Sequence, residues 1–89
     1  MTPEPPDRPI AARCDDAHLH VTLGDGRALR APLWRRPRLL AASAAERAAV
    51  ETSPIGLHWP AIDEDVSVAS ILRGGKAPGA KPAPAARRD

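Results

Sequence analysis

The 89-residue sequence contains no phenylalanine and no tyrosine, and its aromatic side chains other than histidine are two tryptophans. The hydrophobic core must therefore consist of Leu, Ile, Val, Ala and Trp side chains. The less polar central part of the chain has roughly 65 residues, and a chain of that size buries only about 60% of the surface that its unfolded form exposes. Because such a core is marginal, we expect self-association, for instance as a homodimer, or docking on a partner protein.

Cysteine is almost absent as well. The single cysteine, Cys14, excludes an intramolecular disulfide. No base stands at a fixed spacing from it, so we expect a small buried or half-buried residue and not a catalytic thiol. The sequence also has no Gly-x-Ser-x-Gly, no phosphate-binding loop and no Cys-x-x-Cys. These absences favour a protein that is not an enzyme and that carries no cofactor and no metal.

Long apolar runs are missing too. The chain has neither a charged-then-apolar leader nor the run of about 18 apolar residues that a transmembrane helix requires. We therefore expect a cytoplasmic protein without a membrane partner.

The central part of the chain has no excess of either charge, although the whole sequence carries a net charge of +2 and has a pI of about 9.3. Between Ile10 and Gly74, the basic residues are Arg13, Arg27, Arg30, Arg35, Arg36, Arg38, Arg47 and Arg73, and the acidic residues are Asp15, Asp16, Asp25, Glu46, Glu51, Asp63, Glu64 and Asp65. These two sets are equal in size, so the excess positive charge comes from the C-terminal segment. A basic tail binds phosphate only weakly, and nucleic acid is therefore expected to be a weak partner at most.

Both ends of the chain are rich in proline and polar residues. Residues 1–8 and residues 75–89 contain almost nothing apolar to bury, so we predict that both are disordered tails. Residues 9–74 then form a single α+β domain.

The clearest pattern is an alternation of apolar and polar residues in His18–Leu23, which predicts a strand. The alternation resumes after Gly24-Asp25-Gly26. A three-residue loop with Gly26 in the left-handed conformation keeps the apolar faces together, because it pairs Val21 with Leu29 and Leu19 with Ala31. The same register places His20 opposite Arg30.

The remaining elements follow from capping signals and prolines. Pro9–Cys14 is a weak strand candidate, a short helix is allowed at Pro37–Leu40, and Leu57–Trp59 is a strand closed by Pro60. Ser43 and Glu46 form a capping box that starts a helix running to about Glu51.

The acidic triplet Asp63-Glu64-Asp65 favours the start of a last helix. Its buried stripe is expected at Val68, Ile71 and Leu72, and Trp59 is expected in the core. The resulting order is β-β-β-α-β-α, a small antiparallel β-sheet with two short helices packed on one face.

The histidines offer one class of site. His18 and His20 share one strand face at a spacing that suits a metal, and His58 lies near the acidic triplet. No other Cys/His pair completes a tetrahedral set. An exposed polar strand face and a capped helix start are therefore the competing interpretations.

The most unusual local feature is a run of arginines around Trp34. The five residues that we assign to a partner-binding site are Arg30, Trp34, Arg35, Arg36 and Arg38. Arg and Trp are enriched at protein-binding hot spots. They would also suit a nucleic-acid backbone with Trp34 stacking on bases. The structural alternative is a solvated loop whose arginines pair with the Asp63–Asp65 turn.

These features together resemble the bacterial domain of unknown function 2442 family over about residues 10–74. The residues that carry the resemblance are Leu19-x-Val21-x-Leu23-Gly24-Asp25-Gly26-Arg27, Pro32-Leu33, Pro37-Arg38-Leu39, Glu46-Arg47, Gly56-x-His58-Trp59-Pro60 and Asp63-Glu64-Asp65-x-Ser67-Val68. The resemblance implies a small α+β domain encoded beside another small protein, often of the domain of unknown function 4160 family. It implies a presumed antitoxin in a toxin–antitoxin pair and brings no catalytic residues.

The first functional hypothesis is therefore a non-enzymatic interaction module, antitoxin-like, that binds a small cognate protein. The second is a nucleic-acid-associated regulator that uses the arginine run and the basic tail. The third is a metal-dependent enzyme that uses His18, His20 or His58.

Overall fold

The computed structural model describes residues 7–76 and 79–80. The predicted disorder of residues 1–8 and 75–89 falls mostly outside these described residues. Within the described part of the C-terminal segment, Ala80 is buried.

The first sheet is a three-stranded antiparallel meander of consecutive strands. Its strands are β1 (Pro9–Cys14), β2 (His18–Leu23) and β3 (Ala28–Pro32), in the order β1-β2-β3. The predicted register is confirmed, because Val21 pairs with Leu29 and His20 pairs with Arg30. Gly26 has a φ of 94°, which is the left-handed conformation expected of the three-residue loop.

A connector with three short helical turns follows the first sheet. These are η1 (Leu33–Arg35), α1 (Pro37–Ala41) and α2 (Ala44–Ala48). The predicted capping box is confirmed, since Glu46 N donates to Ser43 Oγ and Ser43 N donates to Glu46 Oε1. The predicted end of this helix at about Glu51 is wrong. Ala49 leaves the helical conformation, and Glu51 instead enters a strand.

The second sheet is also three-stranded and antiparallel. Its strands are β4 (Glu51–Thr52), β5 (Gly56–Trp59) and β6 (Glu64–Ser67), with the turn η2 (Pro60–Ile62) between the last two and the helix α3 (Val68–Leu72) after them. The last helix was expected to start at the acidic triplet, and this prediction is wrong. Asp63 adopts a left-handed conformation that ends η2, and Asp65 lies in β6 opposite His58. The cap of α3 is Ser67, whose side chain accepts from Ser70 N.

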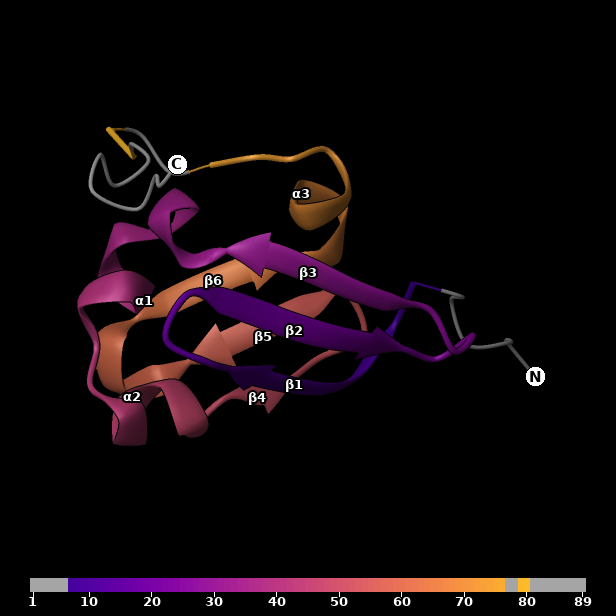
Figure 1. Ribbon diagram of the computed structural model, residues 1–89. Coiled ribbons are helices and arrows are strands. Elements are labelled where there is room, and N and C mark those ends of the chain that lie inside the picture. Colours follow the sequence, from indigo (N-terminus) through magenta and orange to yellow (C-terminus); the bar gives the residue numbers. More distant parts are fainter. Residues whose placement is uncertain (1–6, 77–78, 81–89) are drawn as a thin grey trace.

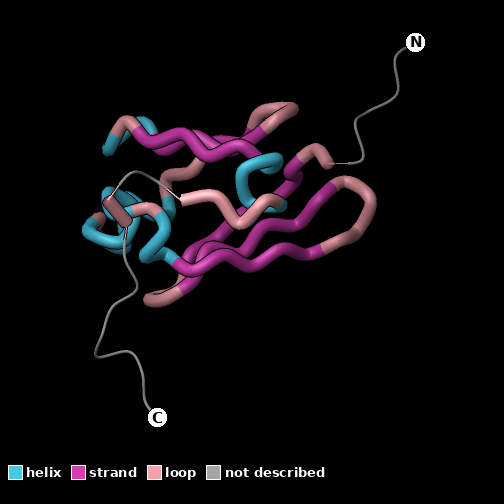
Figure 2. The backbone as a smooth tube through the Cα atoms, turned by 90° about the horizontal axis from the view of Figure 1, so that it is seen from above, coloured by secondary structure: helices cyan, strands magenta, loops and turns pink. Residues whose placement is uncertain are grey.

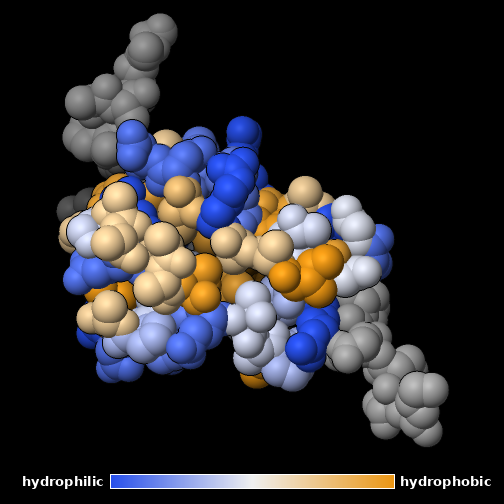
Figure 3. All heavy atoms as spheres, turned by 90° about the horizontal axis from the view of Figure 1, so that it is seen from below, coloured by the Kyte–Doolittle hydropathy of each residue, from blue (hydrophilic) through white to orange (hydrophobic). Residues whose placement is uncertain are grey.

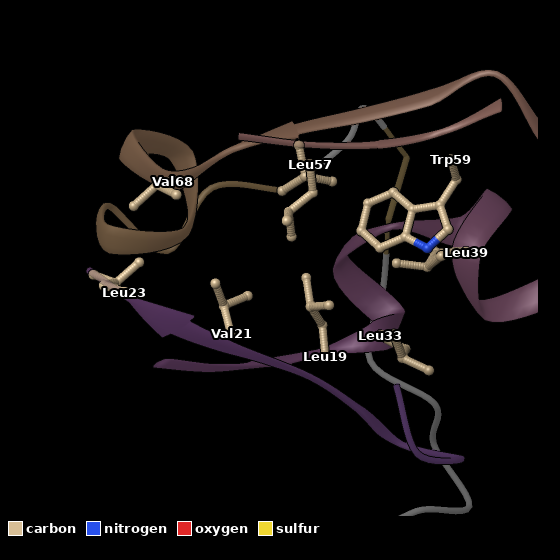
Figure 4. Packing of buried hydrophobic residues seen from close by; sticks show 9 residues of the cluster. Leu19, Val21, Leu23, Leu33, Leu39, Leu57, Trp59 and Val68 are labelled. Carbon is tan, nitrogen blue, oxygen red and sulfur yellow. The ribbon is translucent and has the colours of Figure 1, made fainter. Parts of the chain in front are cut away.

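The two sheets pack face to face as separate layers (Figures 1 and 2). The α+β class and the antiparallel strands are confirmed, and the strands form two sheets where the sequence suggested one. Leu19 and Val21 of β2 point toward Leu57 and Trp59 of β5, and Leu23 points toward Val68 of α3 (Figure 4). Trp59 is fully buried, as predicted, because the core has no other large aromatic ring to fill this space.

The apolar stripe of α3 is shorter than predicted. Val68 is buried and Ile71 packs partly against the core, but Leu72 is 46% exposed. A five-residue helix makes barely more than one turn, so it cannot bury three residues spread over both of its ends.

Candidate functional site

Trp34 and Arg35 lie together in η1, directly after the first sheet. Leu33 fixes this turn, because its side chain is buried and its N–H donates to Ala17 O at 2.8 Å. The Cζ atom of Arg35 lies 5.5 Å from the Trp34 ring centroid, and Lys76 Nζ lies 5.9 Å from it. Both distances fit cation–π contacts. We call Trp34, Arg35 and Lys76 the tryptophan cluster.

Trp34 and Arg35 are half-buried and Lys76 is exposed. The cluster therefore presents an aromatic ring and two cations at the surface. Such a group can contact a partner through both apolar area and charge.

Arg36 and Arg38 instead bind other parts of the same chain. Arg36 Nη2 donates to Ser70 Oγ of α3 at 2.6 Å. Arg38 Nη1 donates to the backbone oxygen of Asp63 at 3.0 Å. These bonds tie the connector to α3 and to the η2 turn. One interpretation of the sequence paired these arginines with the Asp63–Asp65 turn. Arg38 does contact this turn, but through a backbone carbonyl and not through a carboxylate.

Arg30 lies apart from the other predicted site residues, on the outer face of the first sheet. Arg30 pairs with His20 on β2, and His20 pairs in turn with Arg13 on β1. We call Arg13, His20 and Arg30 the basic row. Arg13 and Arg30 are exposed, and neither side chain has an ion-pair partner among residues 7–76 and 79–80. Of the five predicted residues, Trp34 and Arg35 thus lie on one surface and Arg30 lies on another. Arg36 and Arg38 make contacts within the chain.

The histidines do not converge. His18 and His20 lie on the outer face of the first sheet, whereas His58 lies on the outer face of the second. The hydrophobic core separates these faces, so the three imidazoles cannot share one ion. Within the part of the chain that the structure describes, no three His, Cys, Asp or Glu side chains are arranged to hold a metal.

Asp15 holds His20 in place. Its Oδ2 lies 2.7 Å from His20 Nε2, and its Oδ1 accepts from the N–H groups of Ala17 and His18. The hydrogen bond from His20, followed by those from the two amides, holds the pKa of Asp15 well below its usual range. An ionised carboxylate only accepts, so Nε2 is the protonated nitrogen of His20.

Cys14 is half-buried at the end of β1, as expected. Burial raises the pKa of its thiol, and the charge of Arg47 offsets this only in part. A raised pKa leaves the thiol protonated, which is the opposite of an activated nucleophile.

Both outer sheet faces carry open depressions. One of about 200 Å³ is lined by Ala11, Ala12, Arg13, His20 and Thr22. Another of about 280 Å³ lies over the second sheet and is lined by Ser53, Ile55, Gly56, Leu57, His58, Asp65, Val66 and Ser67. The first lining includes the small residues Ala11, Ala12 and Thr22, and the second includes Ser53, Gly56 and Ser67, so a partner could approach the backbone closely at these positions.

Weakly apolar side chains also gather on the underside of the molecule, over α2 (Figure 3). Ala44, Ala45, Ala48 and Ala49 are exposed in this region. Alanine offers little apolar area, so this surface lacks the large anchoring side chains of a binding hot spot.

Two residues were missed in the sequence: Arg13, which contributes to the basic row, and Arg47, whose guanidinium donates to Leu39 O and Leu40 O. Arg13 joins the basic row only through the pairing of β1 with β2. The alternation Ala12, Arg13, Cys14 could have revealed it, because Arg13 lies on the face of β1 opposite to that of its two half-buried neighbours. Arg47 has no such signal, because its contacts depend on how α1 and α2 pack.

None of the helices in residues 7–76 and 79–80 is long and apolar enough to cross a membrane.

A search of curated proteins finds no match to this chain. Among solved structures, the chain is similar to a protein of unknown function from Rhodospirillum rubrum, with 31% sequence identity and a TM-score of 0.71. The similarity covers 82% of this chain and 93% of that one.

A family model described as a protein of unknown function, DUF2442, matches residues 9–77. This range covers both sheets, the connector and α3. The chain therefore belongs to the DUF2442 family.

Proposed function

We propose that this chain is a non-enzymatic protein-interaction module that acts in the cytoplasm as an antitoxin-like partner of a small cognate protein encoded nearby. The family resemblance suggests a toxin-like protein of the domain of unknown function 4160 family as that partner. The tryptophan cluster forms the centre of the interface, and Arg30, on the outer face of the first sheet, lies outside it.

The observation that carries this proposal is the position of Trp34. One of the two tryptophans, Trp59, is fully buried in the core, but Trp34 remains at the surface between two cations. A tryptophan that is not needed for the core and lies beside arginine is the residue type that dominates protein interfaces. Arg36 and Arg38 support this interface by holding the connector in place.

Co-expression with the product of the adjacent reading frame tests the proposal. The double variant Trp34→Ala/Arg35→Ala should weaken co-purification by about thirtyfold or more, since truncating hot-spot residues costs about 2 kcal/mol or more. Arg73→Ala is the matched control, because Arg73 is exposed at the end of α3 and lies outside the cluster. If both variants bind like the natural protein, the interface assignment is wrong.

Nucleic-acid association is the second candidate, and the exposed arginines of the basic row favour it. Binding through Arg13 and Arg30 would neutralise phosphates and release counterions, so affinity for DNA or RNA would fall steeply as salt rises. A gel-shift series over increasing salt distinguishes the candidates. The protein-interaction proposal expects no shift with nucleic acid alone, and a steeply salt-dependent shift would favour the second candidate.

A further inference from the structure

The outer face of the first sheet carries a basic row because of its register, and the Asp15 carboxylate contacts His20 at the centre of that row. Direct cross-strand partners point to the same face of a sheet, so Arg13, His20 and Arg30 form one line across all three strands. The neighbouring line consists of Ala11, Thr22 and Ala28. Ala11 and Thr22 line the depression on this face together with Arg13 and His20.

The outer face of the second sheet has the opposite charge in the same arrangement. Glu51 pairs with His58, and His58 pairs with Asp65, so these residues form an acidic row across β4, β5 and β6. Glu51 is exposed, and the Asp65 side chain is 77% exposed even though it contacts His58 Nδ1 at 2.7 Å. The next line contains only Gly56 and Ser67. Each face is thus a three-strand surface with a histidine at the centre of its charged row.

The two rows cannot neutralise each other within one molecule, because the hydrophobic core lies between the sheets (Figures 2 and 4). We propose that they meet between molecules, so that the basic row of one copy docks on the acidic row of a second copy. Arg13 and Arg30 then lie opposite carboxylates, and the small residues beside each row allow the sheets to approach closely.

This contact is heterologous, since it joins two different surfaces of the same chain. The faces lie on opposite sides of the molecule, so a pair that forms one contact leaves a basic face free at one end and an acidic face free at the other. Further copies add by the same contact, which gives open stacks in place of a closed dimer.

The contact is weak and sensitive to salt. The first sheet, whose strands have five or six residues, measures about 20 Å by about 14 Å, or roughly 300 Å², and the second sheet is smaller, with strands of two to four residues. A stable interface takes about 800 Å² from each partner. Charge attraction must therefore supply much of the affinity. The Debye length falls from about 30 Å at 0.01 M salt to about 3 Å at 1 M salt, so stacks form at low salt and dissociate at high salt.

Self-association does not depend on the proposed partner protein. Arg13 belongs to the basic row and lies outside the tryptophan cluster, while Trp34 belongs to the cluster and lies outside both rows. The variant Trp34→Ala should therefore stack normally, and Arg13→Glu should retain the contacts of the tryptophan cluster.

Sedimentation equilibrium of charge-reversed variants tests the inference. The first variant, Arg13→Glu/Arg30→Glu, has two acidic faces, and the second, Glu51→Lys/Asp65→Lys, has two basic faces. The weight-average mass of the natural protein should rise steadily with concentration at low salt. Each variant alone should associate at least tenfold more weakly, because its facing charges repel. Circular dichroism checks that both variants are folded.

An equimolar mixture of the two variants gives the decisive result. Every basic face then meets an acidic face, so the mixture should regain the rise in mass that each variant lost. Arg73→Glu, which makes the net charge more negative as the first variant does but leaves both rows unchanged, should associate like the natural protein. A natural protein that stays monomeric at low salt, or a mixture that does not re-associate, would overturn the inference.

Discussion

Arg47 joins three elements through its side chain and its backbone. Its Nε donates to Leu39 O at 2.9 Å and its Nη2 donates to Leu40 O at 2.6 Å, so the guanidinium satisfies carbonyls at the end of α1. The backbone oxygen of Arg47 accepts from Trp59 Nε1 at 3.0 Å, which gives the buried indole its hydrogen-bond partner. The planar, forked donor of arginine suits this double contact.

Replacing Arg47 should therefore destabilise the fold more than replacing other surface arginines. We expect Arg47→Ala to lower the free energy of unfolding by about 2 kcal/mol, because two charge-assisted hydrogen bonds are lost from a half-buried position. Arg47→Lys should recover only part of this, since one ammonium cannot reproduce the fork. Urea denaturation measures the difference, with Arg73→Ala as an exposed control expected to change stability by less than about 0.5 kcal/mol. Equal midpoints for Arg47→Ala and Arg73→Ala would contradict this role.

Asp15 gives the protein a specific response to acid. The folded state holds the pKa of this carboxyl below its unfolded value of about 3.9. The ionised carboxylate is therefore more stable in the folded protein than in the unfolded chain. Its contribution to stability is present above the unfolded pKa and is lost as the pH falls through the folded pKa. A carboxyl-detected NMR titration should give Asp15 a midpoint well below the ordinary value. In His20→Ala this midpoint should rise, since the hydrogen bond from His20 is the largest cause of the shift. An ordinary midpoint in the natural protein would show that the pair does not form.

At the scale of elements, the second sheet depends on close approach between β5 and β6. A Cβ atom added to Gly56 would lie 2.5 Å from Val66 O and 3.0 Å from Ser67 Cα, both of which are backbone atoms of β6. Neither can move without displacing the strand. The glycine at this position is therefore a requirement of strand pairing and not of backbone conformation.

We expect Gly56→Ala to lower the free energy of unfolding by about 1–3 kcal/mol, the usual cost of forcing extra atoms into a packed site. Gly24→Ala is the matched control, because its added Cβ would lie 3.6 Å from its nearest neighbour, Arg8 O, in ordinary van der Waals contact. Thermal unfolding of the two variants gives the comparison. If both lose the same stability, the close approach of β5 to β6 is not what matters at Gly56.

The first sheet could be predicted from sequence because its determinants are local. The alternation in β2 and the positive φ of Gly26 leave one register that keeps Leu19 and Val21 on the apolar side. The capping box at Ser43 and Glu46 is equally local, since all of its atoms lie within four residues.

The second sheet could not be predicted in the same way, because its strands are defined by partners. β4 has only two residues, and nothing in Glu51 and Thr52 marks a strand until β5 pairs with them. The acidic triplet suggested a helix start through its charge. In the structure, the left-handed turn at Asp63 and the pairing of Asp65 with His58 outweigh that preference. Ser67 was the better helix signal, as a serine that caps the following turn.

The candidate site was predictable in composition but not in arrangement. The sequence identified the unusual arginine run around Trp34. Which arginines remain at the surface depends on contacts with distant elements, since Arg36 binds Ser70 and Arg38 binds the carbonyl of Asp63. Residue spacing along the connector carries no information about those partners.

At the scale of the whole molecule, two thin sheets share one aliphatic core around a single buried tryptophan. Functional groups are left on the outside, as a basic face, an acidic face and the tryptophan cluster. The imidazoles are divided between the two outer faces, so they do not form one reactive centre. The proposed interface and the proposed self-association use these three surfaces.

The most direct test of action through the tryptophan cluster uses the two tryptophans themselves. The ¹H–¹⁵N NMR spectrum of the chain contains only two indole signals, one from half-buried Trp34 and one from fully buried Trp59. On titration with the product of the adjacent reading frame, the Trp34 indole signal should shift or broaden while the Trp59 signal stays in place. A bound complex in which the Trp34 signal does not change would contradict the account.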